Sequence, residues 1–302
     1  MDATQVFEGS RRKLQGIAYR MLGSVHDAEE VVQDAWLRWN EVEHPRELDS
    51  PEAWLVTTTS RLALDRLRAA KVRRENYPGL WLPEPLLDES PPTPQDVLER
   101  ADDISMAFLV LLEQLAPEAR AAFLMREVFD ASYAEVAQVI GQSEAACRQL
   151  GQRAWEQLRE GRPRQRVSPD VHHQLLSRFA TAATQGDFAA LRTLLDEDAV
   201  LVGDGGGRVP SFGHPLRGGP RIAQLYYATH LRFGAEVRME LARINGQWGL
   251  LRFIDGRLES AQSLELEGER IARIHVQRNP EKLARLMTTL DRQQPVTLRS
   301  TR

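Results

Sequence analysis

A short acidic stretch near the start of the sequence has the residue types and spacing of a docking surface. In AEEVVQDAWLRWN, residues 28–40, apolar side chains recur at the i, i+3, i+4, i+7 spacing of a buried helical stripe. These apolar positions are Ala28, Val31, Val32, Ala35 and Trp39. Asp27, Glu30 and Asp34 fall on another face, with Gln33 beside them. A rigid row of carboxylates suits a basic partner surface, although a solvated helix face has the same composition.

A basic helix end follows this acidic stretch. Between residues 58 and 74 the basic side chains outnumber the acid Asp65 by five. The basic residues are Arg61, Arg66, Arg68, Lys71, Arg73 and Arg74. Ser50 and Pro51 are typical of the start of the helix that carries them. Such cations can neutralise nucleic-acid phosphates, and cations near a helix C-terminus also complement the helix dipole.

Charge along the 302-residue chain is sorted into blocks. The formal net charge is −4, an unusual balance for a nucleic-acid-binding protein. Locally, residues 58–74 carry a net charge of +5 and residues 148–166 carry +4, whereas residues 84–103 carry −6. Two basic blocks separated by an acidic one indicate that charge has separate roles along the chain.

Several protein classes are excluded by composition. The single cysteine, Cys147, rules out an internal disulfide and a cysteine-based metal cage, and it suits a reducing cytosol. The longest apolar run, MAFLVLL at residues 106–112, is too short to cross a membrane. The N-terminus lacks the apolar core of a signal peptide. We therefore expect a cytoplasmic protein with no membrane contact, and no metal site or cofactor.

The pattern of apolar residues and turn signals divides the chain into four parts. Residues 10–75 and 101–160 have helical periodicity, and residues 76–100 hold six prolines and many acids, which is typical of a linker. From residue 171 the pattern changes to helices followed by strands, with hairpin turns expected at the dipeptides 255–256 and 267–268. The last third is therefore predicted to be α+β, with helices packed on one antiparallel sheet.

The stretch ASYAEVAQVIGQSEAACRQLGQRAWEQLR predicts a helix-turn-helix. Gly141 permits the left-handed turn, and Ser143 can cap the second helix. In that second helix Ala146, Leu150, Ala154 and Leu158 are expected to face inward. The outward side chains, which are polar and able to reach base edges in a major groove, are Glu144, Arg148, Gln149, Gln152 and Arg153.

The N-terminal blocks resemble a known family. AYRMLGSVHDAEEVVQDAWLRW followed by AWLVTTTSRLALDRLR is similar to region 2 of the extracytoplasmic-function (ECF) sigma factors, and the helix-turn-helix is similar to their region 4. The resemblance implies two all-α sigma domains, region 2 at residues 6–75 and region 4 at residues 101–162. Region 2 would bind the β′ clamp helices of core RNA polymerase and the −10 promoter element, and region 4 the −35 element.

The resemblance also implies roles for individual residues. The polymerase-binding side chains would be Asp27, Glu30, Gln33 and Asp34. Those that bind promoter DNA in region 2 would be Arg61, Arg66, Lys71, Arg73 and Arg74. In region 4 they would be Glu144, Arg148, Gln149, Gln152 and Arg153. A sigma factor borrows DNA affinity from the core enzyme, which suits the negative net charge.

Residues 170–290 resemble a SnoaL-like domain, a cone-shaped α+β fold that a subgroup of sigma factors carries at the C-terminus. Three motifs support this: WLPEP at residues 81–85, DGGGR at 204–208 and NPEKL at 279–283. The resemblance implies that this domain modulates sigma activity. We expect it to pack on region 2 and on the linker, residues 76–100, with Trp81 buried near the glycine turn. The implied regulatory residues are Trp81, Asp204, Gly205, Gly206, Gly207, Asn279 and Pro280.

A catalytic role for the SnoaL-like domain is not expected, so no catalytic residue is assigned. Polar candidates for a cone cavity exist, but no acid–base pair stands at a fixed spacing, and the glycine motif lacks the Lys-Ser/Thr of a phosphate loop. These candidates are Asp204, His214, Arg217, Tyr226, Asp255 and His275. Binding of an unidentified small-molecule ligand by this domain stays an open alternative. So do two alternatives to a sigma factor, a helix-turn-helix regulator with a small-molecule-sensing domain and a SnoaL-like isomerase or cyclase with a helical partner-binding module.

Overall fold

The computed structural model describes most of the chain, namely residues 3–44, 48–88, 104–161 and 167–293. The structure divides into two compact units, and each unit is made of two separate segments of the chain. The first unit is built from residues 1–76 and 108–162, and the second from residues 77–107 and 163–302. The segment that follows the first three helices therefore belongs to the C-terminal unit.

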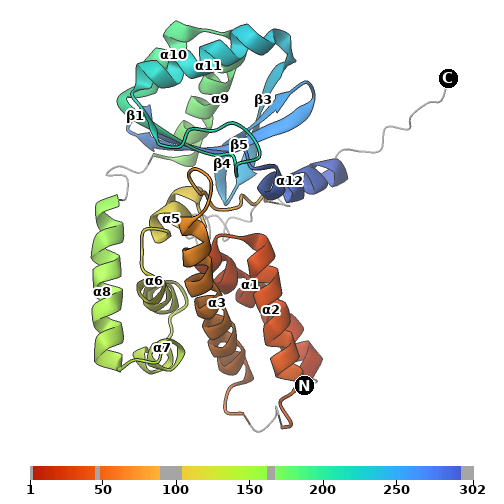
Figure 1. Cartoon of the computed structure of the whole chain (residues 1–302), viewed down its shortest axis with the longest axis vertical. Helices are drawn as coiled ribbons and strands as arrows, with labels where there is room; N and C mark the ends of the chain where they lie inside the picture. The colour runs from red at the N-terminus through yellow and green to blue at the C-terminus, as the bar shows by residue number, and fades with distance from the viewer. Residues whose placement is uncertain (1–2, 45–47, 89–103, 162–166, 294–302) are drawn as a thin grey trace, which may run out of the picture. The chain divides into compact units, whose positions relative to one another are not determined.

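The first unit is all helical, as the periodicity predicts (Figure 1). Its first three helices are α1 (Ala3–Leu22), α2 (Val25–Asn40) and α3 (Pro51–Glu75). Later come α5 (Met106–Leu112), α6 (Pro117–Phe123), a π-helical turn η2 (Leu124–Val128), α7 (Tyr133–Ile140) and α8 (Glu144–Gly161). The apolar stripes of α1, α2 and α3 meet in a core that includes Phe7, Leu14 and Trp39. Burial of these stripes stabilises the three-helix arrangement.

The second unit is α+β, with helices before, between and after the strands of one six-stranded sheet (Figure 1). The helices are α9 (Pro169–Gln185), α10 (Phe188–Leu194), α11 (Gly219–Phe233) with the short η3 (Gly234–Glu236), and α12 (Pro280–Gln293). The strands are β1 (Leu195–Asp204), β2 (Leu216–Arg217), β3 (Val237–Ile244), β4 (Gln247–Ile254), β5 (Arg257–Glu267) and β6 (Arg270–Gln277). The strand order is β2-β1-β6-β5-β4-β3.

The sheet is mixed rather than wholly antiparallel. β3, β4, β5 and β6 form an antiparallel meander, but β1 pairs with β6 in parallel. The predicted hairpin turns are confirmed, because Asp255, Gly256 and Gly268 all have positive φ angles at the β4–β5 and β5–β6 connections. β1 and β6 are far apart in the sequence, and no local sequence pattern predicts that they pair in parallel.

Two apolar clusters lie on the sheet. The larger one joins Phe179 of α9 and Tyr226 of α11 to sheet residues such as Ile274. In the smaller one, Leu283 and Leu286 of α12 pack with Leu251, and partly buried Leu87 packs against them. Neighbouring residues of a strand point to opposite faces, so Leu250 joins the larger cluster and Leu251 the smaller.

Candidate functional site

The acidic face of α2 has an exposed part and a paired part. The apolar stripe predicted for this helix is buried. Gln33 and Asp34 are exposed, whereas Asp27 and Glu30 are half-buried because both carboxylates contact Arg66 of α3. Arg66 Nε lies 3.0 Å from Asp27 Oδ1, and the same guanidinium forms an ion pair with Glu30. The structure therefore joins two residues predicted to bind polymerase with one predicted to bind DNA.

The other basic residues of α3 divide in the same way. Arg61 donates two hydrogen bonds to the backbone oxygen of Gln138 in α7, at 3.2 and 2.8 Å. Arg74 is half-buried, and it bonds Glu113 and the backbone oxygen of Leu22. Lys71 is exposed. The side chain of the remaining predicted DNA contact, Arg73, lies outside the described part of the chain.

A charged cluster links α3 to the helices after the linker. The carboxylate of Glu113 forms ion pairs with both Arg74 and Arg120. Arg120 Nη1 lies 2.6 Å from Glu113 Oε1. Arg120 is 2% exposed and also donates to the backbone oxygen of Met21 at 2.8 Å. Arg68 pairs with Glu118 at 2.9 Å. Sequence reasoning missed Glu113 and Arg120, because their sequence spacing of seven residues also suits two unrelated solvated positions.

The helix-turn-helix forms as predicted. A capping box between Ser132 and Glu135 starts α7, Gly141 ends it at φ +76°, and the Ser143 side chain accepts the Ala146 N–H at 3.3 Å. The five side chains predicted to face outward from α8 are all exposed. They are Glu144, Arg148, Gln149, Gln152 and Arg153.

The predicted inward stripe of α8 needs a correction. The buried positions are Cys147, Gly151, Ala154 and Leu158, whereas Ala146 and Leu150 are half-buried. The small residues Cys147 and Gly151 let α8 pack closely. The prediction from helical spacing missed them because it was based on larger apolar side chains.

In the C-terminal unit, the carboxylate of Asp204 binds residues 77–88, hereafter the linker segment. Asp204 is fully buried. It accepts the Leu82 N–H at 3.0 Å and the Tyr77 hydroxyl at 2.7 Å, and it lies 2.7 Å from Lys282 Nζ. Burial and the Asp204 carboxylate raise the pKa of Tyr77 above its ordinary value. The phenol therefore stays a protonated donor.

The end of β6 and the start of α12 supply further contacts to the linker segment. Gln277 Nε2 donates to the backbone oxygens of Leu82 and Pro83, both at 3.2 Å. Asn279 Nδ2 donates to the Tyr77 hydroxyl at 3.0 Å. Side-chain groups of Asp204 and Gln277 thus satisfy the buried backbone of Leu82 and Pro83, as buried polar backbone requires.

The glycine turn after Asp204 fits closely around its neighbours. Gly206 and Gly207 have φ angles of +62° and +68°, which side chains rarely adopt. A Cβ on Gly206 would lie 2.4 Å from Asn279 atoms, and one on Gly207 would lie 2.6 Å from Pro78 Cγ. A Cβ on Gly205 would meet backbone at 2.3 Å. The glycines therefore serve a tight turn that another segment approaches, as the sequence indicates.

Trp81 is half-buried rather than buried, which corrects its expected role as the apolar anchor. Its ring lies 4.2 Å from Lys282 Nζ, a cation–π contact. Its neighbour Leu82, 1% exposed, is the buried anchor. Pro280 is exposed at the start of α12, where its ring suits the first helical turn.

A second set of contacts binds the far end of the linker segment. Leu86 and Asn245 exchange hydrogen bonds, from Asn245 N to Leu86 O at 2.8 Å and from Leu86 N to Asn245 Oδ1 at 3.1 Å. Asp88 accepts the Gly246 N–H at 3.2 Å. The linker segment is therefore docked at both ends. The rest of the predicted acidic linker, residues 89–103, lies outside the described residues.

The other polar candidates of the C-terminal unit do not gather at one site. His214, Arg217 and Asp255 are exposed. Tyr226 is buried and donates to Gln262 at 2.7 Å. His275 is buried, and burial lowers its pKa to about 3. No cluster of three potential metal ligands occurs among the described residues.

Comparison with known proteins places these features in a family. The sigma-70 region 2 model matches residues 6–73, and the sigma-70 region 4 model matches residues 105–158. The ECF RNA polymerase sigma factor SigJ of Mycobacterium tuberculosis is 38% identical over 80% of this chain and 78% of its own length. This chain belongs to the ECF sigma factors. Its family directs core RNA polymerase to promoters, and this sigma factor does the same.

The likeness extends to the C-terminal unit. The crystal structure of SigJ covers 93% of this sigma factor and 98% of that chain, with a TM-score of 0.74 and 32% identity. A second relative, the probable sigma factor SigI of Mycobacterium tuberculosis, is 31% identical over 93% of this chain and 94% of its own length. The predicted fold class, two helical sigma domains and then an α+β domain, is confirmed. Among its described helices, none is both long and apolar enough to cross a membrane.

Proposed function

We propose that α2 docks this sigma factor on the β′ clamp helices through Asp34, Gln33, Glu30 and Asp27. α3 then reads the −10 element and α8 the −35 element, in the cytoplasm, where core polymerase works. Asp34 and Gln33 are exposed and make the first contact. A basic docking surface also competes with Arg66 for the carboxylates of Asp27 and Glu30. Docking thereby releases Arg66 toward DNA, so polymerase binding and promoter reading are coupled.

The single observation that carries a regulatory role is the contact of α3, the proposed −10 reader, with α6 and α7, the helices that pack against the proposed −35 reader α8. Arg61 of α3 bonds Gln138 of α7, and Arg68 pairs with Glu118 of α6. The −10 and −35 elements are about 25 base pairs apart, roughly 85 Å of B-DNA at about 3.4 Å per base pair. While α3 is bonded to α6 and α7, α3 and α8 are too close to occupy both elements, so this is a closed state.

The C-terminal domain favours this closed state by holding the linker segment, which follows α3 directly. We propose that this action is not catalytic. In the cavity of the domain, Arg252 and Arg278 bind the carboxylate of Glu259. Arginine stays protonated at neutral pH, so neither arginine can act as a general acid or base. Opening of the readers requires release of the linker segment from Asp204 and its neighbours.

A loosened glycine turn tests the regulatory role. In the full chain, Gly207→Ala places a Cβ against Pro78 and adds about 1–2 kcal/mol of left-handed strain. We expect more promoter-specific transcript with purified core polymerase. The matched control is Gly213→Ala, because an added Cβ there meets open space. The regulatory role would be contradicted if Gly207→Ala, Gly213→Ala, a chain ending at residue 168 and the wild type all gave the same amount of promoter-specific transcript.

A further inference from the structure

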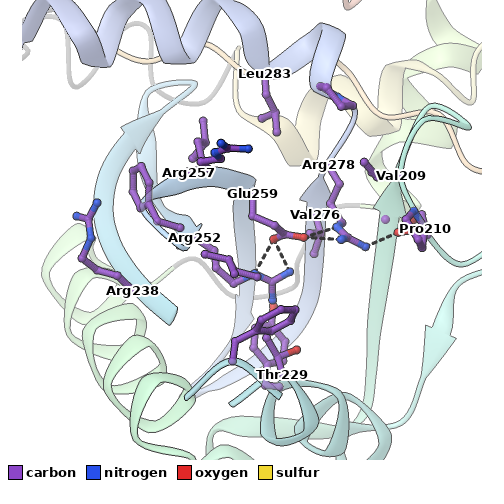
Figure 2. A pocket seen from close by; sticks show the side chains of 18 of the residues that line it. Val209, Pro210, Thr229, Arg238, Arg252, Arg257, Glu259, Val276, Arg278 and Leu283 are labelled. Carbon is purple, nitrogen blue, oxygen red and sulfur yellow. Dashed lines mark hydrogen bonds and ion pairs between the residues drawn. The ribbon is translucent and has the colours of Figure 1, made fainter. Parts of the chain in front are cut away.

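The C-terminal domain contains a cavity of about 1190 Å³, and none of the residues assigned above to polymerase or DNA binding lines it. Its wall comes from β1, β3, β4, β5, β6, α11, α12 and the loop at residues 209–212. Figure 2 shows Glu259, Arg252 and Arg278 pointing toward one another in its interior. Ligand pockets in proteins are typically about 300–1,000 Å³, so this cavity is large enough for an organic molecule of substantial size.

The base of the cavity carries a fixed charge arrangement. Glu259 accepts Arg252 Nε at 2.7 Å and Arg278 Nε at 2.5 Å. Burial opposes ionisation of Glu259, but Arg252 and Arg278 hold its pKa below the ordinary value. Two guanidinium groups share one carboxylate, which leaves one positive charge in surplus. Arg278 also donates to the backbone oxygen of Pro210, so its position is fixed from two sides.

Arg252 is the better placed of the two to receive a ligand. It is 8% exposed, and its guanidinium carbon lies 5.8 Å from the centroid of the buried Tyr226 ring. Glu259 engages its Nε and Nη2 atoms. A guanidinium carries five N–H donors in one plane, so N–H groups of Arg252 are available to a second acceptor. A buried positive charge with spare planar donors matches the two oxygens of a carboxylate.

Further charged residues line the cavity beyond its base. Arg232, Arg238 and Arg257 add positive charge, and Asp291 of α12 adds one negative charge. Arg238 lies over the Phe253 ring at 4.1 Å and also pairs with Glu240, which reduces its contribution. Among the described lining residues the balance is positive, which favours entry of an anion.

Two helices contribute apolar side chains to the remaining wall. It includes Leu225 and Phe233 from α11 and Leu283, Met287 and Leu290 from α12. An apolar body against these side chains is stabilised by burial, at about 25 cal/mol per Å² of area removed from water. A small inorganic anion would leave this wall unused, and a neutral lipid would leave the buried surplus charge without an acceptor.

We infer that this cavity binds an amphiphilic organic carboxylate, with its head at Arg252 and Arg278 and its apolar body between α11 and α12. The site adjoins the linker contacts, because Arg278 stands between Gln277 and Asn279, whose side chains hold the linker segment. Only this connection to the linker rests on the proposed regulatory role. Binding itself is measured without polymerase or DNA, so either idea can fail alone.

Titration calorimetry on the full chain tests the site, with dodecanoate as the probe and dodecan-1-ol as its neutral match. We expect dodecanoate to bind and the alcohol to bind at least about tenfold more weakly, since a hydrogen bond to a charged group contributes about 1.5–3 kcal/mol. Arg252→Gln should weaken dodecanoate at least about tenfold. The control Arg192→Gln, exposed on α10 and outside the cavity, should bind like the wild type.

A second variant covers the case in which Arg252→Gln does not fold. Thr229→Trp fills the cavity from α11 without removing a charge, and it should abolish binding of dodecanoate. Equal affinity for the acid and the alcohol would overturn the carboxylate head site. Undiminished dodecanoate binding by Thr229→Trp would place the ligand elsewhere and overturn the inference.

Discussion

At the scale of single residues, Asp204 is the group on which the linker contacts converge. Its carboxylate accepts a backbone N–H from Leu82 and a hydroxyl from Tyr77, and it pairs with Lys282. Breaking a buried charge pair by removing one partner costs about 3–5 kcal/mol. Asp204→Asn should therefore destabilise the C-terminal domain and accelerate amide exchange at Leu82.

The control for this prediction is the neighbouring pair of Glu281 and Arg208, in which both side chains are 66% exposed. Surface pairs contribute about 0–1 kcal/mol, so Glu281→Gln should leave amide exchange at Leu82 unchanged. Equal exchange rates at Leu82 in Asp204→Asn and Glu281→Gln would contradict the role given to Asp204.

The sequence predicts exposed functional side chains more readily than buried ones. The outward face of α8 follows from helical spacing, and all five of its predicted side chains are exposed. Arg66 is different, because its pairing with Asp27 and Glu30 joins residues on separate helices. Arg252 lies on β4, Glu259 on β5 and Arg278 directly after β6. Strand register brings them together, and the sequence alone does not show that register.

At the scale of elements, α8 carries the predicted contacts to the −35 element. A side chain that reads a base edge contributes about 1–3 kcal/mol of discrimination. Arg153→Ala should therefore weaken holoenzyme binding to a promoter by about tenfold or more and relax selectivity at one −35 position. Gln157→Ala serves as the control, because Gln157 donates instead to the backbone oxygen of Gln114. Unchanged selectivity in Arg153→Ala would contradict the assigned reading face.

The elements themselves were largely predictable, and their long-range pairing was not. Helical periodicity, the cap at Ser143 and the turn at Gly141 predict the helix-turn-helix, which the structure contains. The parallel pairing of β1 with β6 has no sequence signal, and it makes the sheet mixed. The linker segment reads as an extended spacer from its prolines, yet it is docked because Asp204 and Asn245 satisfy its backbone.

At the scale of the whole molecule, contacts within the first unit hold α3 against α6 and α7, the helices that pack with α8. A reversible lock tests whether these contacts must open. With Arg61→Cys and Gln138→Cys joined by a cleavable bis-maleimide, promoter-specific transcription should be lost and should return after cleavage. The native Cys147 is fully buried and should react slowly. Each single cysteine variant should show the same activity before and after this treatment. Transcription by the locked chain at the level of the untreated double variant would contradict an obligatory opening.

The central claim, docking through the acidic face of α2, is tested most directly by assembly of holoenzyme from purified core polymerase and charge-reversed chains. Asp34→Arg places a cation on an exposed position that faces the predicted basic surface, and like charges at an interface cost several kcal/mol. We predict at least about a tenfold loss of affinity for core polymerase, with wild-type affinity for Glu43→Arg, an exposed acid beyond the end of α2. Wild-type affinity in Asp34→Arg would contradict the account.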